Sequence, residues 1–218
     1  MKHIRKSREP NEFAAWKQTA IPGTAQRYQD LAGKPRESLV KSLLSEQGDL
    51  CCYCMRRISA ADSHVEHFRP QTHYPKRDLE YSNLLASCSG EHDDSPPLHC
   101  GHAKGNRPAP GTEDEHLLLS PLSPDCERFF RYTLEGEVLP TDEDDRESSA
   151  ERTISILKLD EPNLQAQRKR ALTAVINLLK AATFDEIEDE IALYGKRSRT
   201  KQFAPFCAAI IYILKWYR

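Results

Sequence analysis

Four cysteines are spaced so that their sulfur atoms could hold one metal ion. Two form the pair Cys51-x-x-Cys54, a loop in which both thiolates can reach one tetrahedral zinc ion at about 2.3 Å. The other two, Cys88 and Cys100, lie further apart than in a compact knuckle, because eleven residues separate them. The sequence therefore predicts a structural zinc site made by these four thiolates.

Other residues offer alternatives to this site. His92 and His99 both lie between the third and fourth cysteines and are rival ligands, so a mixed cysteine and histidine site stays open, as do four buried free thiols. Cys52, Cys126 and Cys207 are interpreted as ordinary core or surface residues. The charged N-terminus shows no apolar signal sequence, and seven cysteines, an odd number, then favour metal binding over disulfides.

A second group, His64-Val65-Glu66-His67, could do hydrolytic chemistry. Phosphodiester hydrolysis needs a base that activates water and a divalent cation that neutralises charge on phosphate oxygens. His67 suits the base, with His64 as its substitute, because the ordinary pKa of histidine lies near working pH. Glu66 is a hard oxygen ligand that suits Mg²⁺ or Mn²⁺. Glu66 and His67 can converge only if their strand ends or bulges there, and Pro70 fits an ending.

Five more polar residues are candidates for supporting roles. The amide of Asn83 could bond backbone groups and hold the loop that carries the base, although a plain turn asparagine is the alternative. His102 follows the last cysteine closely and could complete the site of the catalytic cation. Arg69, Lys104 and Arg107 suit contacts with phosphates, against the alternative of a merely solvated charged face.

The elements that must position these residues differ along the chain. Residues 50–110 contain few long apolar runs, so this segment needs a metal to hold its shape. Before it, short helices are expected over Asn11–Gln18 and Glu37–Glu46, the second ended by Gly48. After it, Cys126–Tyr132 and Val138-Leu139 suggest a small hairpin.

The last third of the chain is expected to be helical. Asp142–Glu147 is interpreted as an acidic connecting loop, and Ser148 or Ser149 as the cap of a helix that ends near Leu159. Thr183 and Glu186 form the pattern of a capping box. Two further apolar segments complete this region: Leu172 to Leu179 at helical spacing, and Phe203–Tyr217, apolar almost all round and therefore buried in the helical layer or against a partner.

These patterns predict an α+β fold that is mainly α. A small ββα-metal core with a structural zinc would be flanked by helices from both termini. We divide the chain into a basic helical segment (1–49), the metal-binding core (50–110), a connector with short strands and an acidic loop (111–147), and a helical region (148–218).

The overall charge of the 218 residues excludes little. The formal net charge is −2, so the chain as a whole has no basic field that would attract nucleic acid. Residues 1–60 nevertheless carry 11 Lys and Arg against 6 Asp and Glu. The longest apolar stretch, Phe206–Leu214, is about half the length of a membrane span, so we expect no membrane segment and a cytoplasmic location.

The order of these motifs resembles the HNH (His-Me finger, ββα-metal) nuclease family. The resemblance rests on Cys51 and Cys54, Glu66-His67 with Pro70, Asn83-Leu84, Cys88 and Cys100, and Lys104. It implies that His67 is the general base, that Glu66 and a late ligand hold one divalent cation, and that Asn83 orients the base loop. The family often has Asn directly after the last cysteine, whereas this chain has Gly101 there and His102 next.

More of the chain resembles the PtuB-type HNH subunits of Septu-type and retron-associated bacterial anti-phage systems. The similar segments are Met1-Lys2-His3-Ile4 with Pro10, Cys51-Cys52-Tyr53-Cys54, His64-Val65-Glu66-His67-Phe68, and Ile156-Leu157-Lys158-Leu159 with Asn163-Leu164 and Arg168. The resemblance implies a PtuA-like ABC/SMC ATPase as partner and, in the retron form, a reverse transcriptase with its msDNA.

The activity expected from these residues is metal-dependent cleavage of nucleic acid by an HNH endonuclease, with structural Zn²⁺ and catalytic Mg²⁺ or Mn²⁺. A non-catalytic zinc-stapled module that binds nucleic acid or protein is the alternative. It would keep the cysteines but would have no need of Glu66-His67. A scaffold for a partner ATPase, built mainly on the helical region, is a third interpretation.

Overall fold

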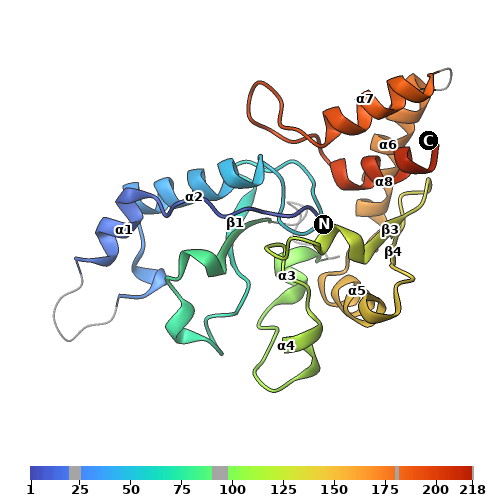
Figure 1. The fold of residues 1–218 in the computed structure, drawn as a ribbon. Coiled ribbons are helices and arrows are strands. Elements are labelled where there is room, and N and C mark those ends of the chain that lie inside the picture. Colours follow the sequence, from blue (N-terminus) through green and yellow to red (C-terminus); the bar gives the residue numbers. More distant parts are fainter. Residues whose placement is uncertain (20–25, 90–97, 180–181, 218) are drawn as a thin grey trace.

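The computed structural model of the chain describes residues 1–19, 26–89, 98–179 and 182–217. In these residues helices predominate and the strands form two small antiparallel sheets (Figure 1), which confirms the mainly helical α+β fold predicted from the sequence. The helices are α1 Asn11–Lys17, α2 Gly33–Gln47, α3 Cys100–Lys104, α4 Glu113–Leu117, α5 Asp144–Leu157, α6 Pro162–Leu178, α7 Phe184–Tyr194 and α8 Cys207–Tyr217. The strands are β1 Ser63–His67, β2 Leu84–Cys88, β3 Phe130–Tyr132 and β4 Val138–Pro140.

The strands β1 and β2 and the helix α3 form the expected ββα unit. β1 and β2 are antiparallel, with Ser63 opposite Cys88 and His67 opposite Leu84. β2 contacts both α2 and α3, and all five of its residues are buried. β2 ends at Cys88 and α3 begins at Cys100, so this unit carries two of the four candidate thiolates at the ends of its elements.

A buried glutamine joins α2 to this sheet. The side-chain amide of Gln47 donates to the carbonyl oxygen of Ala86 at 2.8 Å and accepts from its backbone N–H at 2.7 Å. These bonds satisfy polar groups of a buried strand, and the carbonyl oxygen of Ala86 also accepts from the N–H of Cys52 at 3.0 Å. Gly48 then ends α2 with a left-handed φ of 61°, and an added Cβ would lie 2.5 Å from the ring of Phe203. Glycine is therefore required at this crossing.

The helical region begins earlier than the sequence suggested. Asp142–Glu147 was expected to be a loop, but α5 already starts at Asp144. The acidic side chains of Asp144, Asp145 and Glu147 lie in its first turn, where the positive end of the helix dipole stabilises them. The predicted capping box of Thr183 and Glu186 at α7 and the predicted hairpin, formed by β3 and β4, are both confirmed.

The last helix starts later than expected, because residues 203–206 are used for other contacts. The N–H of Phe203 donates to the carbonyl oxygen of Gly48 at 3.1 Å, and the N–H of Phe206 donates to that of Met55 at 3.0 Å. α8 therefore begins only at Cys207. These bonds tie the C-terminal helices, which lie together at one end of the molecule (Figure 1), to the cysteine loop.

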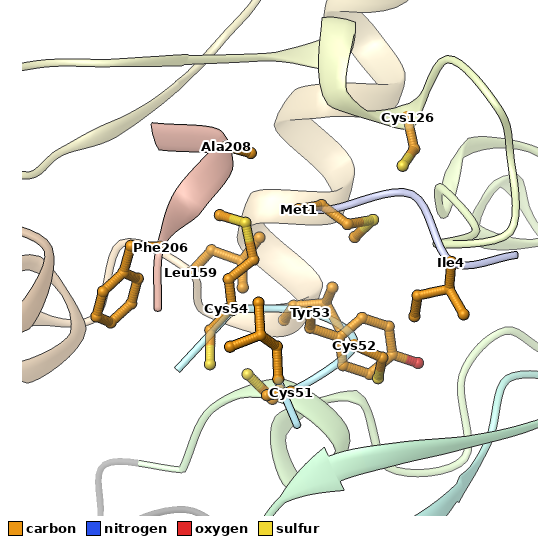
Figure 2. Close-up of a cluster of buried hydrophobic side chains, with 14 of the residues drawn as sticks. Met1, Ile4, Cys51, Cys52, Tyr53, Cys54, Cys126, Leu159, Phe206 and Ala208 are labelled. Atoms are coloured by element: carbon orange, nitrogen blue, oxygen red, sulfur yellow. The ribbon is translucent and has the colours of Figure 1, made fainter. Parts of the chain in front are cut away.

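The cysteine loop lies inside the hydrophobic core rather than on the surface. Figure 2 shows residues 51–54 surrounded by side chains from distant parts of the sequence, among them Met1, Ile4, Leu159 and Phe206. All four of these side chains are buried. The cysteine loop of the segment 50–110 is thus packed between the first residues of the chain and the helical region. Within the described residues, none of the helices is both long and apolar enough to cross a membrane.

Candidate active site and metal centre

The four predicted thiolates come together in one buried cluster. The sulfur atoms of Cys51, Cys54, Cys88 and Cys100 all lie within 4.8 Å of one another, and all four side chains are buried. The Sγ atoms of Cys54 and Cys88 are 3.9 Å apart. Four thiolates placed tetrahedrally around zinc at about 2.3 Å would be about 3.8 Å apart. The cluster therefore fits a structural zinc ion in both donor type and spacing.

Neighbouring polar groups hold the sulfur atoms in place. The backbone N–H of Cys88 donates to the Sγ of Cys51 at 3.4 Å, and the N–H of Gly101 donates to the Oγ of Ser87 at 3.2 Å. The rival ligand His99 is buried, with its Nδ1 atom 3.2 Å from the Sγ of Cys100. It lies beside the four-sulfur cluster, which is complete without it. The other rival, His92, falls outside the described residues.

The three remaining cysteines lie in the core. Cys52, Cys126 and Cys207 are buried and unpaired. Burial raises the pKa of Cys126 to about 12 and that of Cys207 to about 11, and it also raises the pKa of Cys52. These thiols stay neutral near pH 7, as expected of ordinary core cysteines.

Glu66 is a buried carboxylate with one oxygen held by the protein. Its Oε1 atom accepts a hydrogen bond from the hydroxyl of Tyr53 at 3.1 Å and pairs with the ammonium of Lys104 at 2.8 Å. Its Oε2 atom lies 3.4 Å from the Nε2 atom of His64, which shares this face of β1. Burial opposes ionisation most strongly, but hydrogen bonds from His64 and Lys104 outweigh it and lower the pKa of Glu66. Glu66 is therefore an anion near pH 7.

Lys104 lies in the interior, not at a surface where phosphates could reach it. Only 2% of the residue is exposed. Besides pairing with Glu66, its ammonium donates to the carbonyl oxygens of His67 at 3.0 Å and Arg107 at 2.9 Å. These bonds join α3 to the end of β1. Lys104 is therefore not accessible for the phosphate contact expected from the sequence.

Replacing Lys104 with methionine should destabilise the chain by about 3–5 kcal/mol, because it leaves the Glu66 carboxylate buried without its cation. Lys76→Met is the matched control, since Lys76 is an exposed lysine in the segment that connects β1 to β2. Urea unfolding followed by circular dichroism measures both free energies of unfolding. Equal stability of the two variants would show that Lys104 does not support the site.

His67, the last residue of β1, has its ring fixed by a backbone group. Its Nε2 atom lies 3.0 Å from the carbonyl oxygen of Asp78, and its ring packs edge-on against that of Tyr28 at 4.7 Å between centroids. A carbonyl oxygen can only accept, so Nε2 carries the proton and Nδ1 keeps its lone pair in the neutral ring. Burial lowers the pKa of His67, against an opposing effect of Asp78. The neutral ring is the form that can accept a proton.

Asp78 was not identified from the sequence, where no motif singles it out. Its buried carboxylate accepts from the backbone N–H of Tyr28 at 2.8 Å, from Nε of Arg27 at 3.1 Å and from the amide of Gln71. These bonds fix the backbone that presents the carbonyl oxygen to His67. Asp78 is therefore a positioning residue, recognisable only once the loop after Pro70 is folded back onto β1.

Asn83 makes the backbone contacts that a loop-pinning amide makes. Its Oδ1 atom accepts from the N–H of Arg69 at 2.7 Å, and its Nδ2 atom donates to the carbonyl oxygens of Arg69 at 2.9 Å and Arg77 at 3.1 Å. The segment that follows His67 is thereby tied to the start of β2. Asn83 itself is buried and does not reach the surface.

The two candidate arginines lie at the edges of the site. The guanidinium of Arg69 is close to the ring of Tyr74 and donates to the carbonyl oxygen of Glu115 at 3.2 Å. One of its nitrogens, NH1, is buried without a hydrogen-bond partner in the part of the chain that the structure describes. Arg107 is exposed and donates to the carbonyl oxygen of Ala103. Arg107 is therefore open to a phosphate, whereas NH1 of Arg69 is buried and lies 4.0 Å from Oε1 of Glu115.

His102 is exposed, and its ring lies against that of His64 with 4.6 Å between centroids. Among the described residues, only the four cysteines bring three or more possible ligand atoms within 4.8 Å of one another. His102 thus does not close a three-ligand site with His64 and Glu66. The structure brings the side chains of His64 and Glu66 together and places His102 against His64, whereas the ring of His67 contacts Asp78 and Tyr28.

The ββα unit with its four-cysteine cluster, and with His67 and the buried Glu66 at the end of its first strand, agrees with the HNH class expected from the sequence. No protein-family model matches the chain. A protein of Vibrio cholerae serotype O1 biovar El Tor named "Retron Vc95 putative HNH endonuclease" is 31% identical over 147 residues, which cover 65% of this chain and 67% of that protein. The chain belongs to the same HNH endonuclease family.

Proposed function

We propose that this chain is a metal-dependent endonuclease that hydrolyses phosphodiester bonds in nucleic acid. The observation that carries the proposal is the ring of His67, held through Nε2 by the carbonyl oxygen of Asp78 and adjacent in sequence to the buried anion Glu66. A base with an open lone pair and a hard ligand at the end of one strand are the two groups that hydrolysis with a divalent cation requires.

In this mechanism Nδ1 of His67 takes a proton from a water molecule as the water oxygen attacks phosphorus. The bond from phosphorus to O3′ breaks, the leaving oxygen takes a proton from solvent, and the products are a 5′-phosphate and a 3′-hydroxyl. Glu66 and its neighbours would hold Mg²⁺ or Mn²⁺, which when bound neutralises charge on the phosphate and the leaving oxygen. On RNA the ribose 2′-hydroxyl is an alternative nucleophile. In that case His67 takes the proton of this hydroxyl, the bond from phosphorus to O5′ breaks, and the products are a 2′,3′-cyclic phosphate and a 5′-hydroxyl.

Arg69 and Arg107 are proposed to bind the substrate backbone. Guanidinium groups suit phosphate oxygens, and such contacts position a nucleic acid without reading its sequence; Arg107 is the exposed one of the two. The near-neutral total charge makes these local contacts more important than long-range attraction.

The test is cleavage of DNA and of RNA, including tRNA, by the wild type and by a His67→Ala variant, with Mg²⁺, with Mn²⁺ and with EDTA. Product ends identify the nucleophile. A non-catalytic zinc-stapled binding module is the competing function. It predicts binding without cleavage and no effect of the His67 change on either.

The name of the Vibrio cholerae relative places that protein in a retron. We propose the same setting for this chain: an anti-phage complex in which it works with a PtuA-like ABC/SMC ATPase and, in the retron form, with a reverse transcriptase and its msDNA. The packed helices α6, α7 and α8 support a docking role, since they carry exposed apolar side chains. These are Leu178, Phe184, Leu193 and Trp216.

Changing Trp216 to aspartate should abolish co-purification with the ATPase while leaving the chain folded. Trp216 is 76% exposed, so the isolated chain gains nothing from its burial. Co-expression followed by affinity purification measures the interaction, and Lys215→Asp on the same exposed end of α8 is the control for added charge. A variant that still co-purifies would move the docking surface elsewhere.

A further inference from the structure

Gly101 lies against the side chains of Glu66 and His64, and a side chain at position 101 would have to move them. A Cβ atom built at this position would lie 2.5 Å from the Oε2 atom of Glu66 and 2.6 Å from the Nε2 atom of His64. Carbon atoms do not approach nitrogen or oxygen this closely without displacing them. The space that a side chain at position 101 would enter is therefore occupied by the imidazole of His64 and the carboxylate of Glu66.

Among the described residues, the imidazole of His64 makes one long hydrogen bond, through its Nε2 atom. Its Nε2 atom is 3.4 Å from Oε2 of Glu66, longer than an ordinary bond between a nitrogen and a carboxylate. Its Nδ1 atom is buried and has no hydrogen-bond partner among the described residues. With the proton on Nδ1, Nε2 keeps a lone pair that could bind a cation beside Oε2 of Glu66.

The separation of these two atoms fits two ligands of one cation. Ligand atoms at a right angle around Mg²⁺ or Mn²⁺, with bonds of about 2.1 Å, lie about 3.0 Å apart. The 3.4 Å between Nε2 of His64 and Oε2 of Glu66 is within a small adjustment of that distance. Tyr53 and Lys104 already hold Oε1 of Glu66, which leaves Oε2 facing His64. Bonds such as those of Tyr53 and Lys104 to Oε1, the oxygen that faces away from the cation, orient a ligating carboxylate.

We propose that His64, rather than His102, is the second protein ligand of the catalytic divalent cation, and that a side chain at position 101 would displace the two ligand atoms. This assignment rests on the function proposed above and replaces the late ligand predicted from the sequence. His102, which is exposed, covers the outer side of the His64 ring instead of binding the ion.

Mn²⁺ binding by the zinc-loaded full chain tests the assignment. Titration calorimetry gives the affinity, and pulsed electron paramagnetic resonance detects coupling between Mn²⁺ and a ligating ¹⁴N nucleus. In the wild type we expect one site with nitrogen coupling. His64→Ala should remove the coupling and weaken Mn²⁺ binding by more than about tenfold, since even outer-shell changes cost about 10–100-fold. His102→Ala, the matched control, should keep the coupling and most of the affinity.

Gly101→Ala tests the geometry without removing a ligand. The added methyl group should displace His64 and Glu66 and lower Mn²⁺ affinity, with the zinc content unchanged. Zinc content and thermal unfolding confirm that each variant is folded. Should His64→Ala keep the nitrogen coupling while His102→Ala loses it, the assignment is overturned, and the same holds if the wild type binds no Mn²⁺.

The outcome is separable from that of the nuclease assay. A wild type that binds Mn²⁺ through His64 but cleaves neither DNA nor RNA would support the ligand assignment and contradict the nuclease function. Cleavage by the wild type, together with Mn²⁺ coupling that survives in His64→Ala, would support the nuclease function and contradict the ligand assignment.

Discussion

Replacing His67 with alanine should reduce the rate of cleavage by on the order of 10²–10⁴-fold, because a general base typically contributes that much. The fold and the zinc content should not change. In the part of the chain that the structure describes, the ring of His67 lies at the end of β1 and is not part of the four-cysteine cluster. Single-turnover cleavage of a labelled substrate measures the rate.

His73→Ala is the matched control for this experiment. His73 is an exposed histidine in the loop that follows the same strand, so its removal should leave the rate unchanged. Full activity of His67→Ala, with folding confirmed, would show that His67 is not the general base. Equal losses in both variants would point to damage in the loop rather than to a missing base.

Replacing Cys51 with serine should abolish zinc binding and unfold most of the chain. Structural zinc sites bind with apparent free energies of about 10–16 kcal/mol in small zinc peptides. The total stability of a folded domain is only about 5–15 kcal/mol. The loop that carries Cys51 packs against Met1 and Ile4 (Figure 2), and the N–H of Phe206 bonds to it at Met55. Loss of the metal should therefore spread beyond residues 50–110.

Elemental analysis and hydrogen exchange measure this effect. The wild type, purified without chelator, should contain about one zinc per chain, a stoichiometry set by one four-thiolate site. Cys126→Ser is the control, because Cys126 is a buried cysteine outside the four-sulfur cluster. This variant should keep its zinc. Wild-type protein without zinc would contradict the structural role of the cluster. Fast exchange limited to residues 50–110 would contradict its coupling to the rest of the core.

Short-range patterns were sufficient for the parts of the site that are close in sequence. Cys51-x-x-Cys54 fixes two ligands within one loop, and His64-x-Glu66 places two side chains on one face of a strand. The capping box at Thr183 is likewise a local pattern, and it was found where it was predicted. In these cases the backbone geometry of a few consecutive residues decides the result.

Local patterns were insufficient where two influences competed at an element boundary. Acidic residues suggested a loop at Asp142–Glu147, yet the same charges stabilise the first turn of α5. The apolar segment from Phe203 was interpreted as one helix, but Phe203 and Phe206 bond to the backbone around the cysteine loop and delay α8 to Cys207. These contacts cross about 150 residues, a separation that no periodicity reports.

The sequence by itself thus determined which groups are present: four thiolates whose spacing suits zinc, and a histidine and a carboxylate of the types that the proposed hydrolysis needs. Only the tertiary structure decided how those groups are used. The buried position of Lys104, the carbonyl oxygen of Asp78 that holds His67, and the packing of Gly101 against His64 all depend on β1, β2 and α3 meeting. The reason is physical: burial and hydrogen-bond partners are properties of the folded neighbourhood, whereas ligand type and spacing are properties of the chain.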